Sequence, residues 1–81
     1  MITKAQIKHI RSLDDKKYRT EFKQFVVEGE KMIAELLNSN FDVIEVYATL
    51  EWFSMNPLFI KNTTKKIEIS KHQLSQISHL N

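Results

Sequence analysis

The chain has 81 residues, of which 42% are hydrophobic and 27% charged, a composition that predicts one small globular domain and not a disordered segment. It contains no cysteine, which excludes disulfide bonds, thiolate zinc sites and thiol nucleophiles. No apolar run approaches the roughly 20 residues of a membrane span, and no secretion signal is evident, so we expect a cytoplasmic protein without a membrane partner. Residues 1–24 hold seven Lys or Arg against three Asp or Glu, whereas the remainder is slightly acidic. This asymmetry predicts a polyanionic partner.

A first helix is predicted between Thr3 and Asp14-Asp15. Thr3 and Gln6 have the spacing of a capping box, in which side chains satisfy the free N–H groups of a helix start. Ile2 and Ile7 flank that box at the positions of a hydrophobic staple. The buried face is predicted to consist of Ile7, Ile10 and Leu13.

The same helix carries a row of cations. Lys4, Lys8 and Arg11 recur at i, i+4 and i+7, so they share one face within roughly 60° of arc. Residues 16–23, predicted to form a polar basic connection with at most a helical turn, add Lys16, Lys17 and Arg19. Most Lys-rich helices simply present a solvated face, but this local concentration favours contact with the phosphates of RNA or DNA. Such contacts would set the position of a nucleic acid without reading its sequence.

Residues 25–37, with the sequence FVVEGEKMIAELL, predict a strand, a turn and a helix in succession. Phe25-Val26-Val27 is aromatic and β-branched, as strands favour. Gly29, the only glycine, suits a sharp turn, and apolar residues at helical spacing follow it. Glu28 and Glu30 lie at the helix start, where negative charge is favourable. An acid there could also accept hydrogen bonds from a base or an arginine, so Glu28 and Gly29 are candidate binding residues, with turn geometry as the alternative.

The middle of the chain continues the alternation of helix and strand. Residues 38–40, Asn-Ser-Asn, predict the end of the second helix with an Asn in the left-handed conformation. Residues 43–49 are nearly all apolar and predict a strand covered on both faces. Residues 50–56 predict a short helix that Pro57 interrupts, and residues 58–60 its continuation after a kink.

The C-terminal part completes the pattern. Residues 66–69 predict a third strand, and Ser70 with Gln73 repeats the capping box ahead of a last helix. The buried residues of that helix are predicted to be Leu74, Ile77 and Leu80. We therefore predict an α/β fold in one domain over residues 1–81, a small three-layer α/β/α sandwich with a mostly parallel sheet.

Patterns for catalysis and metal binding are missing from the sequence. A single glycine excludes the glycine-rich loops that bind nucleotides. His72 and His79 are two helical turns apart, roughly 10 Å, which is too far to share a metal ion. Trp52 and Phe53 could stack on bases, but such a pair in a short amphipathic helix more often anchors a core. We expect no catalytic residue and no metal in this chain.

Several segments together resemble the N-terminal substrate-binding domain of SpoU/TrmH-type RNA 2′-O-ribose methyltransferases. They are Ile7-Lys8, Leu13, Lys16-Lys17-Tyr18-Arg19, residues 25–31, residues 46–49 with Trp52, and Ile69-Ser70. Matched position by position, the signature residues are Lys8, Lys17, Arg19, Glu28 and Gly29. The chain departs from the family in two places: it has Gln6-Ile7 where the family often has Asn-Pro, and Lys23-Gln24 where the family often has a Gly.

The resemblance implies a fold like that of ribosomal kink-turn RNA-binding proteins and a role in presenting rRNA or tRNA to a catalytic domain, expected after residue 81. That knotted domain would bind S-adenosylmethionine and form a homodimer. The 81 residues would then be a monomer without a cofactor and without a DNA partner. Two alternatives remain open: a stand-alone kink-turn-type RNA-binding protein without enzymatic activity, and a protein-interaction module with no RNA affinity at low salt.

Overall fold

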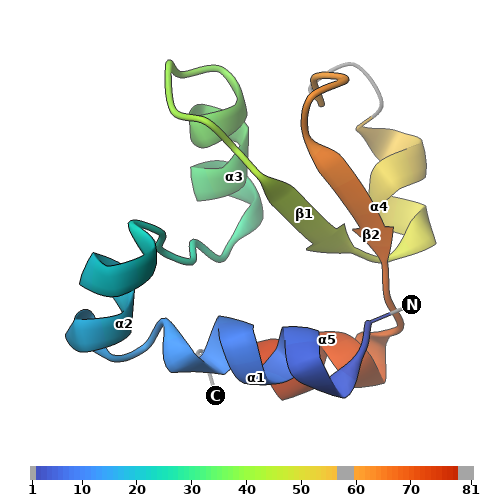
Figure 1. The fold of residues 1–81 in the computed structure, drawn as a ribbon. Coiled ribbons are helices and arrows are strands. Elements are labelled where there is room, and N and C mark those ends of the chain that lie inside the picture. Colours follow the sequence, from blue (N-terminus) through green and yellow to red (C-terminus); the bar gives the residue numbers. More distant parts are fainter. Residues whose placement is uncertain (1, 57–59, 79–81) are drawn as a thin grey trace.

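The computed structural model describes residues 2–56 and 60–78 of the chain. In order, these residues form α1 (Lys4–Ser12), α2 (Lys16–Phe22), α3 (Glu30–Leu37), β1 (Glu45–Ala48), α4 (Leu50–Met55), β2 (Lys65–Glu68) and α5 (Lys71–Ile77), as Figure 1 shows. No helix in this described part is long and apolar enough to cross a membrane.

Capping boxes fix the starts of α1 and α5, as the sequence predicts. The Thr3 hydroxyl accepts the N–H of Gln6 at 3.1 Å, and the Gln6 side chain accepts the N–H of Thr3 at 2.8 Å. Ser70 and Gln73 exchange the same two bonds, of 3.1 and 3.0 Å. Each box satisfies two N–H groups that a helix leaves without an intrahelical partner.

Residues 16–22, predicted as mainly a connection, form the complete helix α2. Asp15 caps its start, because its carboxylate accepts the N–H of Lys17 at 2.9 Å. The sequence prediction placed Asp14-Asp15 only at the end of the preceding helix, so it did not include this capping role. α2 ends at Lys23, whose φ of 54° and ψ of 42° lie in the left-handed region that glycine adopts most easily. Lys23 thus adopts the left-handed conformation in the segment where the family that the sequence resembles often has a glycine.

β1 and β2 form a parallel sheet, which is two-stranded in the described residues. The register pairs Glu45 with Lys65 and Ala48 with Glu68, and one further backbone hydrogen bond of 2.9 Å extends the ladder at each end. Parallel strands need a crossover connection, and α4 lies within it.

The sheet separates two hydrophobic cores, because successive side chains of a strand point to opposite faces. Val46 and Ala48 are buried in a core with residues of α3 and α4, whereas Tyr47 packs with Ile67 and Ile69 in a core with residues of α1 and α5. α1 and α5 also pack against each other (Figure 1). The sheet therefore lies between two helical layers, and the predicted α/β/α sandwich with a parallel sheet is confirmed.

The predicted strand at residues 25–27 is not formed. This segment runs between α2 and α3 without a ladder partner. Val26 packs on the core of α1 and α5, while Phe25 is exposed and contacts Phe41 edge-on, with ring centroids 6.0 Å apart. Strand propensity measures how well side chains fit a half-buried pleated surface, and the three residues meet no such surface here.

Smaller differences concern the ends of helices. Asn38 ends α3 with a φ of −95°, which is outside the predicted left-handed region, and its side-chain amide donates to the carbonyl of Ala34 at 3.1 Å. Leu74 is 38% exposed and not buried as predicted, whereas Ile77 is buried. Pro57, most of the predicted continuation at residues 58–60, and Leu80 lie outside the described residues.

Candidate nucleic-acid interface

The predicted cations lie on two consecutive helices, α1 and α2, which follow one another along one border of the molecule (Figure 1). Five of them are exposed and are named here the α1–α2 cations: Lys4, Lys8, Arg11, Lys16 and Lys17. The sixth, Arg19, is half-buried. Exposed cations of this kind can neutralise phosphates and release the counterions bound there.

Side-chain contacts hold the two basic helices against each other. The His9 ring contacts Phe22 edge-on at a centroid distance of 4.9 Å, and its Nε2 lies 3.0 Å from Oε1 of Gln24. Tyr18 stacks on Phe22 at 6.2 Å. Phe22 thus packs against α1, and its side chain stays 44% exposed. These contacts fix the angle between α1 and α2, the two helices that carry the cations.

Arg19 anchors the junction between the helices. Its Nη1 donates to the carbonyl oxygens of Leu13 at 3.0 Å and Asp14 at 2.7 Å, at the C-terminal end of α1. A cation at that end also complements the negative pole of the helix dipole. This role could not be predicted, because Arg19 is one residue of a basic run in which nothing distinguishes it from its neighbours.

Replacing Arg19 with alanine is expected to lower the free energy of unfolding by about 1.5–3 kcal/mol, the range for hydrogen bonds made by a charged group. Urea denaturation followed by circular dichroism measures this change. Lys16→Ala is the matched control, because Lys16 lies on the same helix with an exposed side chain, and we expect it to stay within about 0.5 kcal/mol of the parent. Equal stability of the two variants would contradict the anchoring role.

Two of the α1–α2 cations also make contacts within the protein. Arg11 Nη1 donates to the carbonyl of Gln76 near the end of α5, over a long 3.4 Å. Lys17 Nζ lies 5.6 Å from the centroid of the Tyr18 ring, at the outer limit of a cation–π contact. Both side chains remain exposed, so these weak contacts leave their charges accessible to phosphates.

Glu28 and Gly29 lie apart from the cations, at the start of α3. Gly29 is the N-cap, with a φ of 98° and a ψ of 135° that side-chain-bearing L-residues rarely adopt. A Cβ at Gly29 would meet no atom within 4 Å. The glycine is therefore required by backbone conformation and not by packing, which supports the turn-geometry interpretation. Glu28 is half-buried beside it, and its predicted role in binding stays a prediction.

Gly29→Ala is expected to destabilise the domain by about 1–3 kcal/mol, the cost of holding a non-glycine residue in a sparsely populated conformation. For a domain of this size that corresponds to a melting temperature lower by about 4–8 °C per kcal/mol. Lys31→Ala is the control, because Lys31 is exposed near the start of the same helix, and we expect it to stay within about 0.5 kcal/mol of the parent. Equal melting temperatures for the two variants would contradict this account.

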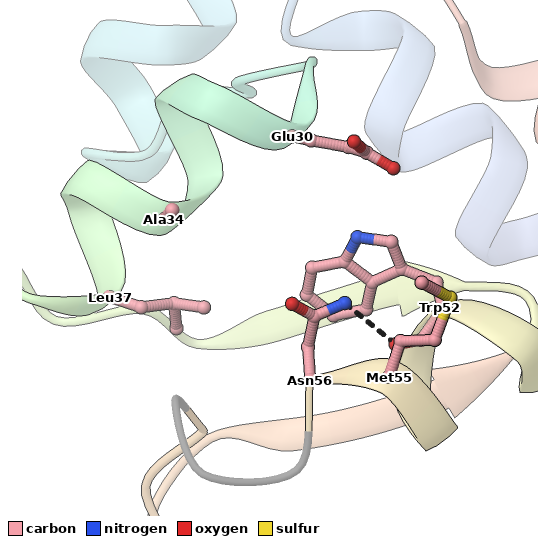
Figure 2. Close-up of a pocket in the computed structure, with 6 residues that line it drawn as sticks. All are labelled: Glu30, Ala34, Leu37, Trp52, Met55 and Asn56. Atoms are coloured by element: carbon pink, nitrogen blue, oxygen red, sulfur yellow. Dashed lines mark hydrogen bonds between the residues drawn. The ribbon is translucent and has the colours of Figure 1, made fainter.

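A pocket of about 180 Å³ lies between α3 and α4 (Figure 2). Its lining residues are Glu30, Ala34, Leu37, Trp52, Met55 and Asn56. Trp52 is half-buried, belongs to the core of α3 and α4, and contacts Phe53 edge-on at 5.6 Å. The interpretation of Trp52 as a core anchor is thus confirmed, and the same ring also borders the pocket.

Two further features of the described residues bear on chemistry. No group of three or more His, Asp or Glu side chains in that part could hold a metal ion. The Tyr47 hydroxyl donates to Oε1 of Glu45 at 2.8 Å. Burial, and then this hydrogen bond, raises the pKa of Tyr47 above its ordinary value. The phenol therefore stays protonated at neutral pH and acts as a hydrogen-bond donor to Glu45, not as a base.

One family model describes nearly the whole chain: the model of the MRM3-like substrate binding domain matches residues 4–81. That range contains all the helices and strands described above. No curated protein and no solved structure matches the chain, so the implied likeness to kink-turn proteins stays a prediction.

Proposed function

Because the chain belongs to the family of MRM3-like substrate binding domains, the substrate-binding part of SpoU-related RNA methyltransferases, we propose that it holds rRNA or tRNA for ribose 2′-O-methylation. In this proposal the methyl transfer takes place on a separate catalytic domain that follows residue 81, binds S-adenosylmethionine and forms the homodimer. The observation that carries the proposal is the family match over residues 4–81.

The charge distribution supports RNA as the partner. The α1–α2 cations are exposed on two helices held together by packing, which suits them to follow a phosphate backbone. Contacts to phosphates would thus fix the position of the substrate RNA on the domain. Selection of the nucleotide to be methylated would fall to other contacts, outside the α1–α2 cations.

S-adenosylmethionine is too large for the pocket beside Trp52. The pocket between α3 and α4 measures about 180 Å³, whereas pockets for small molecules and cofactors usually measure about 300–1,000 Å³. We therefore assign the cofactor to the separate catalytic domain, and we assign RNA binding alone to the residues described.

Lys17→Ala is expected to weaken RNA binding about tenfold at 50 mM salt, because losing one phosphate contact removes the release of about one counterion. Fluorescence anisotropy with a structured tRNA or rRNA fragment measures the affinity. Lys71→Ala is the control, since Lys71 is exposed on α5, outside the α1–α2 cations. Equal losses for the two variants would place the interface elsewhere, and no binding by the parent chain at low salt would overturn the proposed function.

A further inference from the structure

We propose that the pocket between α3 and α4 is a subsite for one unpaired RNA base and that it prefers guanine. This inference rests on the proposed function, because it assumes that RNA reaches the surface. It goes beyond that function by naming a second site, with a different chemistry from that of the α1–α2 cations.

The shape of the pocket suits one flat ring system. Its volume of about 180 Å³ is well below that of a typical small-molecule pocket, about 300 Å³ or more. Figure 2 shows the space between Ala34 and Leu37 of α3 on one side and Trp52 on the other. The small side chain of Ala34 leaves that space open, and the half-buried Trp52 ring is held in place by the core. Aromatic side chains in such positions stack on unpaired bases.

Three side chains bring polar atoms to the pocket: Glu30 and Asn56 offer acceptor oxygens, and the indole N–H of Trp52 is a donor on the ring edge that faces Glu30 (Figure 2). The carboxylate of Glu30 lies over the edge of the Trp52 indole (Figure 2). Asn56 donates its Nδ2 to the backbone carbonyl of Trp52 at 2.9 Å, and this bond fixes the amide so that Oδ1 points away from the helix (Figure 2). A base in the pocket can therefore donate N–H groups to Glu30 and to Oδ1 of Asn56.

Guanine matches this set of acceptors better than the other bases do. Its Watson–Crick edge carries two neighbouring donors, N1–H and the N2 amino group, which one carboxylate can accept together. Adenine and cytosine place an unprotonated ring nitrogen beside their amino group, and that nitrogen would face the negative charge of Glu30. Uracil offers a single N–H between two carbonyl oxygens.

The negative charge of Glu30 also determines how an RNA would approach. A carboxylate repels phosphates, so the backbone stays outside the pocket and only a base enters. Phosphates would contact the α1–α2 cations while the pocket reads one base, which is the usual division between positioning and specifying contacts. Glu30 is exposed, so its charge can meet a base without a large rearrangement.

The test uses the full chain and two RNA pentanucleotides, UUGUU and UUAUU, which carry equal phosphate charge and differ in one base. Trp52 is the only tryptophan, so quenching of its fluorescence reports stacking at this pocket. We expect UUGUU to bind about tenfold or more tightly than UUAUU, as for a bidentate contact to a base edge, and to quench Trp52 more strongly. Glu30→Gln should reduce this preference to less than about threefold, while Glu35→Gln, on the same helix but outside the pocket lining, should keep it.

A second variant separates the pocket from the phosphate contacts. Ala34→Leu fills the space beside Trp52 and should abolish the preference for UUGUU while leaving the salt-dependent binding of both RNAs. Equal binding of the two RNAs by the parent chain would overturn the guanine subsite and leave the proposed function standing. Binding of neither pentanucleotide would also overturn the subsite, whereas the proposed function falls only if the structured RNA fragment does not bind at low salt either. Quenching of Trp52 by arginine amide as strong as that by UUGUU would show a site for cations and also overturn the subsite.

Discussion

RNA affinity is expected to fall about 60- to 250-fold when the salt concentration rises from 50 to 200 mM, if four or five of the α1–α2 cations contact phosphates. Each contact on a single-stranded or structured RNA contributes a slope of about −0.7 to −0.9 in a plot of log K against log salt, so the total slope should be about −3 to −4. Fluorescence anisotropy at four or more salt concentrations gives this slope directly. It is the largest effect that the proposed interface predicts for binding.

The controls for this experiment are variants that remove lysine charges either within α1 and α2 or outside them. A variant with Lys8 and Lys17 both replaced by alanine should show a slope smaller in magnitude by about 1.4–1.8, because two counterion-releasing contacts are gone. Replacing Lys61 and Lys71, which are exposed outside α1 and α2, should leave the slope unchanged. A parent slope close to zero would rule out binding through the basic helices.

Ile67→Ala is expected to lower the free energy of unfolding by about 2–5 kcal/mol, the range for truncating a fully buried aliphatic side chain. Ile67 is 6% exposed, lies in β2 opposite Tyr47, and joins the core between the sheet and the layer of α1 and α5. Its removal leaves a cavity at the centre of that core. Because small domains have total stabilities of about 5–15 kcal/mol, a large share of the molecules should unfold under mild denaturant.

Two further variants serve as controls for the loss of stability in Ile67→Ala. Ile67→Val removes one methyl group and should cost only about 0.5–1.5 kcal/mol. Lys66→Ala changes the preceding residue of the same strand, whose side chain is exposed, and should change stability by less than about 0.5 kcal/mol. An Ile67→Ala variant as stable as Lys66→Ala would mean that this core does not hold the domain together.

The elements that sequence reasoning predicted correctly are those fixed by local chemistry. The capping boxes at Thr3 and Ser70 need only residues three apart, and the start of α3 needs only the glycine at position 29. The prediction of a strand at residues 25–27 was wrong. A strand requires a partner elsewhere in the chain, and the sequence of these three residues carries no information about that partner. The αL lysine at position 23 could not be predicted either, since lysine has no preference for positive φ.

In the candidate site, too, the features that depend on residues distant in the sequence could not be predicted. The shared face of Lys4, Lys8 and Arg11 could be predicted from their spacing, because spacing on a helix determines which residues share a face. Lys16 and Lys17 could be recognised only as part of a basic run. The anchoring role of Arg19 depends on where two helices meet, so a basic run in the sequence could not distinguish it from Lys16. The pocket beside Trp52 likewise needs α3 and α4 to be placed in space before it exists.

The alternation along β1 has a consequence for cooperativity. Val46 and Tyr47 are neighbours in one strand, yet their side chains belong to the two different cores. If β1 unfolds, both cores lose side chains at the same time. Neither helical layer then has the apolar surface that it needs to stay folded. The domain should therefore melt in a single transition. The basic helices on one side and the Trp52 pocket on the other are then linked thermodynamically, and each keeps its shape only while the shared strand stays in place.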